Sequence, residues 1–111
     1  MKSAQDQWVM LCSASDVSPG AMKGFSVAGK KIALFRDDDG THYATTNICT
    51  HEYALLTDGW LEDGEIECPL HSGRFCIRTG KVLCKPATTD LPTYAVKIED
   101  GSIFVALPCE D

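Results

Sequence analysis

The sequence predicts an all-β protein, and three observations lead to this prediction. Short segments rich in β-branched and aromatic residues alternate with clusters of Gly, Asp, Asn and Pro along the whole chain. No longer segment keeps the 3.6-residue apolar periodicity of an amphipathic helix. The chain has 111 residues, which suits one compact domain with a modest core. We therefore expect a single domain over residues 1–111.

In the first half, the expected strands follow one another through tight turns. We expect a strand at Trp8–Cys12, followed by a pair at Met22–Val27 and Lys30–Arg36 that is joined around Ala28-Gly29. The run DDDG at 37–40 then leads into a further strand at His42–Thr45. Asp and Gly tolerate the positive φ angles of such turns.

A second pair is expected near the end of the chain, where Tyr94–Ile98 and Ser102–Leu107 flank the turn EDG at 99–101. Apolar residues alternate along both segments, as they do in strands with one face on a core. Between these two halves, the stretch from Cys49 to about Pro86 is loop-rich and holds four of the six cysteines. We expect the chemistry to reside there.

Composition and charge exclude several classes of function. The chain carries 10 basic and 16 acidic side chains, a formal net charge of −6, which argues against binding nucleic acid. No run is apolar and long enough for a membrane span, and the first residues lack the apolar core of a signal peptide. The expected location is the cytoplasm, where a cysteine pattern indicates a metal site more often than disulfides.

Two short motifs stand out in the middle of the chain. Cys49 and His51 form a C-x-H motif, and Cys68 and His71 form a C-x-x-H motif. Sixteen residues separate the two motifs. Together they supply two thiolates and two imidazoles, which is a complete set of four ligands for a metal centre.

Three interpretations of this set compete. The four residues could be ordinary buried cysteines and surface histidines, or they could hold a structural zinc ion. Zinc sites of this composition usually pair two cysteines in one segment and two histidines in another. Here each loop contributes one of each, which suits a dinuclear centre whose cysteines bind one iron and whose histidines bind the other.

At this point the chain resembles the Rieske-type [2Fe-2S] proteins, whose signature is C-x-H followed by C-x-x-H. The runs TDGWL at 57–61 and EIECPLHSGRF at 65–75 look like those of the Rieske ferredoxins in bacterial aromatic-ring-hydroxylating oxygenase systems. The resemblance implies a sandwich of two small antiparallel sheets, with a third hairpin carrying the cluster at one tip, in a cluster-binding subdomain at about 46–87. It also implies that Cys49 and Cys68 hold the inner iron, and that His51 and His71 hold the outer one.

By the same resemblance, the chain would be a soluble one-electron carrier and not itself an enzyme. It would take electrons from a flavin-containing NAD(P)H-dependent reductase and pass them to the terminal oxygenase of an aromatic-hydrocarbon pathway. Two rivals share the motif. The catalytic subunit of such an oxygenase also needs a mononuclear iron held by two His and a carboxylate, for which only His42 remains. The small subunit of an assimilatory nitrite reductase would instead require a sirohaem-containing partner.

The ligand set bears on the reduction potential. With neutral imidazoles, an oxidised cluster of two ferric ions, two sulfides and two thiolates carries no net charge, so it accepts an electron more readily than an all-cysteine cluster. High-potential relatives add a disulfide, at positions that match Ala54 and Leu70, and place hydroxyls where this chain has Gly73 and Phe75. Because this chain lacks the disulfide and the hydroxyls, we expect its reduction potential near the low end of the Rieske range of about −150 to +300 mV.

Charges are unevenly distributed around the motifs. Six acidic residues and no basic ones lie in 52–67, whereas 68–86 holds four basic residues, Arg74, Arg78, Lys81 and Lys85, and no acid. Such runs are either solvated faces or docking patches for redox partners, and both interpretations stay open.

The remaining residues of note are interpreted as structural. Cys12, Cys76, Cys84 and Cys109 are expected to be buried small hydrophobes. Five aromatic residues are expected in the core, namely Trp8, Trp60, Phe25, Phe35 and Phe104. His42 is expected at the surface or pairing within a strand.

Overall fold

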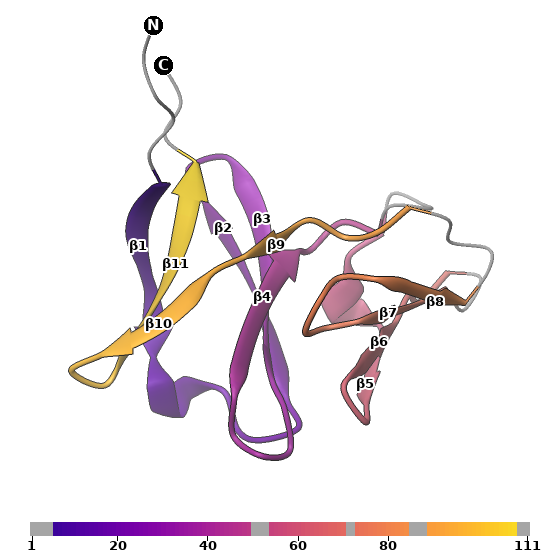
Figure 1. Ribbon diagram of the computed structural model, residues 1–111, viewed down its shortest axis with the longest axis horizontal. Helices are drawn as coiled ribbons and strands as arrows, with labels where there is room; N and C mark the ends of the chain where they lie inside the picture. Colours follow the sequence, from indigo (N-terminus) through magenta and orange to yellow (C-terminus); the bar gives the residue numbers. More distant parts are fainter. Residues whose placement is uncertain (1–5, 50–53, 71–72, 85–88, 109–111) are drawn as a thin grey trace, which may run out of the picture.

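The computed structural model describes residues 6–49, 54–70, 73–84 and 89–108. The regular elements formed by these residues are mainly β-strands, arranged in three antiparallel sheets (Figure 1). The strands are β1 (Asp6–Ser13), β2 (Met22–Val27), β3 (Lys30–Arg36), β4 (His42–Thr46), β5 (Trp60–Glu62), β6 (Glu65–Glu67), β7 (Arg74–Cys76), β8 (Val82–Cys84), β9 (Thr93–Tyr94), β10 (Val96–Glu99) and β11 (Ser102–Pro108). Two single-turn 3₁₀-helices, η1 (Ala14–Asp16) and η2 (Leu56–Asp58), complete the described elements.

The first sheet has the strand order β1-β11-β10 and the second the order β2-β3-β4-β9. The third sheet contains only strands from the middle of the chain, in the order β5-β6-β7-β8. Figure 1 shows this third sheet to one side of the other two. The expected all-β class and small antiparallel sheets are confirmed, but the third element is a four-stranded sheet and not the single hairpin that the resemblance implied.

Strand β3 is buried on both faces and joins two separate cores. Ile32 and Leu34 pack with Ile103 and Val105 in a cluster formed with the first sheet. Phe35, on the opposite face of β3, packs in a second cluster with residues of the third sheet. Because side chains alternate along a strand, a single continuous apolar run serves both clusters.

Three two-residue turns place both central residues at positive φ, which is the conformation of type I′ hairpins. Ala28 and Gly29 join β2 to β3, with φ angles of 51° and 78°. The same conformation occurs at 63–64, between β5 and β6, and at 100–101, between β10 and β11. The expected hairpins around 28–29 and 99–101 are therefore confirmed.

Two expectations about the fold were wrong. The segment Tyr94–Ile98 is not one strand: β9 ends at Tyr94 and pairs with β4, whereas β10 pairs with β11 in the other sheet. Trp8 and Trp60 are not in the core, because 44% and 59% of their surfaces are exposed. Phe25 and Phe104 are only partly buried, whereas Phe35 is fully buried as expected. Among the described residues, no helix is long and apolar enough to cross a membrane.

Candidate metal centre

Cys49 and Cys68, the two cysteines of the predicted ligand set, lie in the same hydrophobic core. Only 3% and 0% of their respective surfaces are exposed. Both belong to the cluster between β3 and the third sheet, which also contains Leu56 and Phe75. The structure thus brings together two cysteines that are nineteen positions apart in the sequence.

Each of these cysteines stands at the stem of a loop closed by its own backbone. The N–H of Cys49 donates a hydrogen bond to the carbonyl oxygen of Ala54 at 2.9 Å. The N–H of Cys68 donates in the same way to the carbonyl oxygen of Gly73 at 2.7 Å. Both stems are therefore held by a bond from the cysteine to the fifth residue after it. The predicted ligands His51 and His71 belong to these loops but lie outside the described residues.

The chemistry of the two thiols fits a metal centre. Neither cysteine forms a disulfide. A buried thiolate needs a compensating charge, which a bound metal supplies. Within the described ranges, no three His, Cys, Asp or Glu side chains form a metal-binding group. The structure therefore describes the cysteine half of the predicted site.

Around these thiols, the positions expected to carry hydroxyls in high-potential relatives have none. Phe75, on β7, is fully buried in the same cluster as both cysteines. Gly73 is also buried, and its carbonyl oxygen is already used in closing the second loop. Leu70 lies at the surface, directly before His71. The second loop thus reaches solvent at this point.

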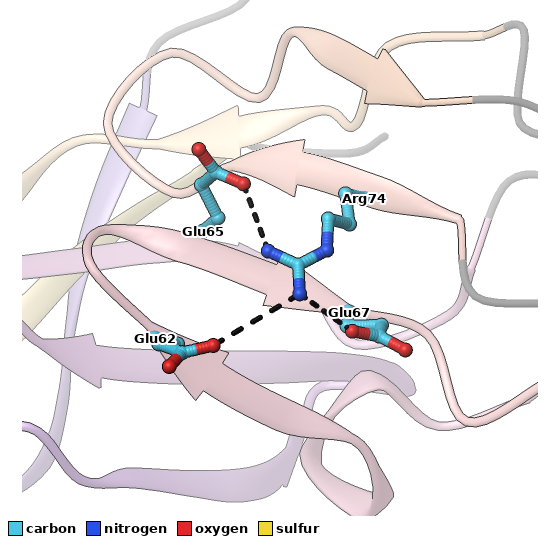
Figure 2. A network of polar contacts seen from close by, with 4 residues as sticks. All are labelled: Glu62, Glu65, Glu67 and Arg74. Carbon is cyan, nitrogen blue, oxygen red and sulfur yellow. Dashed lines mark hydrogen bonds and ion pairs between the residues drawn. The ribbon is translucent and has the colours of Figure 1, made fainter.

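One face of the third sheet carries an ion-pair network centred on Arg74 (Figure 2). Arg74 donates hydrogen bonds to Glu65 at 3.1 Å and to Glu67 at 2.8 Å. The carboxylate of Glu62, on β5, lies 4.0 Å from the same guanidinium group. The hydrogen bond to Glu65 is the largest cause of the raised pKa of Arg74. Arg74 therefore lies within an acidic surface formed by Glu62, Glu65 and Glu67. The acidic run 52–67 and the basic run 68–86 of the sequence are not separated in space at this residue.

The other cysteines behave differently from one another. Cys12 is buried as expected, and this burial is the main cause of its raised pKa. Cys76 is only partly buried, which corrects the expectation. Burial acts to raise the pKa of Cys76, but hydrogen bonds from Thr79 and the charge of Arg78 together lower it. The side chain of Cys84 and the whole of Cys109 lie outside what the structure describes.

His42 lies in β4 opposite Arg36, so its expected pairing within a strand is confirmed, while its expected surface position is wrong. Only 7% of its surface is exposed, and both ring nitrogens are buried. Burial, followed by the charge of Arg36, lowers the pKa of His42. The imidazole is thus held in its neutral form.

Sequence reasoning missed Asn47 and Thr57, which are joined by two hydrogen bonds across the base of the first loop. No pattern in the sequence could have identified them, because the burial of Asn47 and its contact with Thr57 arise only in the fold.

Comparison with known proteins agrees with this geometry. The family model for the Rieske [2Fe-2S] domain matches residues 7–95. The chain is 46% identical over 101 residues to the ferredoxin component of the naphthalene 1,2-dioxygenase system of Pseudomonas putida, covering 91% of this chain and 96% of that protein. The chain belongs to the Rieske [2Fe-2S] domain family, and this membership supports an iron–sulfur cluster as its cofactor.

Two solved structures extend the comparison. The first comes from the complex of reduced oxygenase and oxidized ferredoxin in carbazole 1,9a-dioxygenase, with a TM-score of 0.85, 37% identity, and coverage of 89% of this chain and 92% of that one. The second is the ferredoxin of carbazole 1,9a-dioxygenase from Nocardioides aromaticivorans IC177, with a TM-score of 0.83, 35% identity, and coverage of 88% and 95%. The fold is therefore that of the Rieske ferredoxins.

Proposed function

We propose that this chain is a one-electron carrier of an aromatic-ring-hydroxylating dioxygenase system, with one [2Fe-2S] cluster held by Cys49, His51, Cys68 and His71. The observation that carries the proposal is the burial in one core of two cysteines that form no disulfide, each at the stem of a loop that contains a histidine. A zinc-held module would need the same four side chains, but the family match favours the iron–sulfur cluster.

The cluster, when bound, takes up and releases a single electron. The chain's own contribution is to hold the cysteines in an apolar, water-excluding core between β3 and the third sheet. Apolar surroundings without hydroxyl donors leave the negative charge of the reduced form less stabilised. The surface position of Leu70 supports an exit for electrons beside His71.

The proposed partners follow from the relatives. One similar ferredoxin was solved in a complex with its terminal oxygenase. We extend this partnership to the present chain, together with electron supply from a flavin-containing NAD(P)H-dependent reductase. The substrate would be an aromatic compound that the oxygenase binds, so the chain itself performs no catalysis.

The proposed organisation is a single domain over residues 1–111, with a cluster-binding subdomain at about 46–87. Two observations support the subdomain. All four strands of the third sheet come from this stretch and pair only with one another among the named strands. The first two sheets are built from the sequence before and after it.

Reconstitution tests this function. The purified chain is mixed with NADH and with the reductase and oxygenase of a naphthalene dioxygenase system, and formation of the dihydrodiol is measured. We expect product only when the chain is present, and none with the Cys49→Ser variant. Failure of the reductase to reduce the chain would contradict the proposal, as would electron delivery to a sirohaem nitrite reductase alone.

A further inference from the structure

Asn47 is a buried residue whose backbone and side-chain polar atoms each form at least one hydrogen bond. Only 4% of its surface is exposed. Its backbone N–H donates to the carbonyl oxygen of Lys31 at 2.8 Å, and its own carbonyl oxygen accepts from the N–H of Leu56 at 2.8 Å. Asn47 therefore ties β3 and η2 to the end of β4.

The side chain of Asn47 forms a reciprocal pair with Thr57. Its Nδ2 donates to Thr57 Oγ1 at 2.9 Å, and its Oδ1 accepts from the backbone N–H of Thr57 at 2.9 Å. Both bonds run between residues ten positions apart, across the base of the loop that contains Cys49. The pair satisfies the amide almost completely, as burial requires.

These bonds extend the closure of the first ligand loop outward from Cys49. The innermost bond joins Cys49 to Ala54, and a bridge between Ile48 and Leu55 follows it. The Asn47–Thr57 pair comes next and is the only side-chain link in this ladder among the described residues. The second loop, closed at Cys68 and Gly73, has a charged link at the equivalent step, the hydrogen bond from Arg74 to Glu67 at 2.8 Å.

We propose that Asn47 and Thr57 are positioning residues that hold Cys49 at a fixed place for iron. The inference rests on the proposed function, since it assumes that Cys49 is a ligand. The pair acts through the backbone. When its hydrogen bonds break, the base of the first loop keeps its backbone bonds, such as those at 48–55 and 49–54, but loses this side-chain link, and the position of the Cys49 thiol becomes more variable. Opening of this kind limits how long a bound cluster is retained.

Gly24, on the neighbouring strand β2, provides an independent way to disturb the pair. A Cβ added at Gly24 would lie 2.8 Å from Asn47 Nδ2 and 3.0 Å from Thr57 Oγ1. Gly24 is exposed and has no positive φ, so alanine there removes no polar group and strains no turn. Gly24→Ala should therefore displace the pair by contact alone.

The test measures cluster loss and not electron transfer. Purified variants are exposed to an iron chelator, and the decay of visible absorption is followed. Asn47→Ala removes two net hydrogen bonds, and we expect roughly tenfold faster cluster loss. Thr57→Val and Gly24→Ala should accelerate the loss about threefold or more, whereas Thr57→Ser, which keeps the hydroxyl, should stay near the rate of the parent protein. Asn47→Ala combined with Thr57→Val should be no worse than Asn47→Ala alone.

Val105→Ala is the matched control, because Val105 is fully buried in the core that contains neither Cys49 nor Cys68. It should lower the melting temperature without accelerating cluster loss. Hydrogen exchange of the segment 47–59, followed by mass spectrometry, should rise in Asn47→Ala and stay unchanged in Val105→Ala. Equal rates in all variants, or equal acceleration by the control, would overturn the positioning role. A parent protein that binds no iron would overturn the proposed function as well, so the two failures are distinguishable.

Discussion

Gly59 lies against the carbonyl oxygen of Glu67, so closely that a Cβ on Gly59 would overlap that oxygen. The same Cβ would lie 3.1 Å from Cδ of Pro69. Gly59 ends η2, just after the first ligand loop, and Glu67 directly precedes Cys68. The absence of a side chain at Gly59 therefore allows the stems of the two ligand loops to approach each other.

Replacing Gly59 by alanine should force these stems apart. The neighbour is a backbone carbonyl and cannot move aside as a flexible side chain would, so we expect destabilisation of about 1–3 kcal/mol. Iron content after purification should fall together with the melting temperature. Gly29→Ala is a suitable control: Gly29 has a positive φ of 78° but nothing within 4 Å of an added Cβ. That variant should cost about 1 kcal/mol and leave the iron content unchanged. Full iron loading of Gly59→Ala would contradict the account.

The reduction potential should lie below 0 mV, since the buried surroundings of Cys49 and Cys68 include Phe75 in place of a hydroxyl-bearing residue. Phe75→Tyr adds a hydroxyl to this core. A hydrogen bond to a charged group contributes about 1.5–3 kcal/mol, so the potential should rise by roughly 60–130 mV. A redox titration of both proteins, monitored by visible absorption, measures the difference.

Phe35→Tyr controls for the general effect of a buried hydroxyl, because Phe35 belongs to the same cluster but lies on β3. Its potential should stay near that of the parent protein. A parent potential well above zero, or identical potentials for Phe75→Tyr and the parent, would contradict the explanation from missing hydroxyls.

Protonation of His42 should destabilise the fold in acid. Burial and Arg36 lower the pKa of His42, so the folded form is neutral at a pH where an unfolded chain would already bind a proton. This cost is absent above about pH 6.5 and grows as the pH falls through the ordinary histidine value toward the folded pKa. Each unit of pKa depression corresponds to about 1.4 kcal/mol.

Melting temperatures at pH 7.5 and 5.5 test this effect. The difference between the two temperatures should be smaller in His42→Gln than in the parent protein, since Gln has no proton to gain. Groups facing His42 include Arg36, paired with it on β3, and Lys97 on β10. An equal pH dependence in the two proteins would show that His42 does not contribute.

The acidic surface around Arg74 should speed encounter with a basic redox partner. Glu62 has 72% of its side chain exposed, and Asp63 lies beside it in an exposed turn. Reversing both charges in Glu62→Lys/Asp63→Lys should slow reduction by the reductase about tenfold at low ionic strength. The difference should shrink as salt screens the charges. An unchanged rate at low salt would leave the surface as an ordinary solvated face.

Long strands and their turns could be predicted from the sequence because their signals are local. The pair β2 and β3 is found at the expected residues, since the apolar run of β3 and the Ala28-Gly29 turn both lie in one short stretch. The third sheet could not be predicted, because its strands have three residues each and carry no measurable periodicity. In this sheet, residue type alone is a poor guide to burial. Trp60 was expected in the core, but it lies on the exposed face of an edge strand.

The ligand set was predicted from motif spacing, and the structure places its cysteines in one core. The residues that support them were not predicted. Glycine is needed at position 59 because the carbonyl oxygen of Glu67 leaves no room for a side chain, and Asn47 is needed because it pairs with Thr57. Both relationships join segments that come together only in the fold. No local pattern in a single sequence reports such proximity. Splitting of the expected strand at Ala95 has the same cause, because each half pairs with a different sheet.

The central claim is that Cys49, His51, Cys68 and His71 hold one [2Fe-2S] cluster, and electron paramagnetic resonance with iron and sulfide analysis tests it most directly. The account predicts equal amounts of iron and acid-labile sulfide in the freshly purified protein, and a Rieske-type signal after reduction with dithionite. His51→Ser and His71→Ser should each abolish that signal. Protein that contains only zinc, or a histidine variant with an unaltered iron signal, would contradict the account.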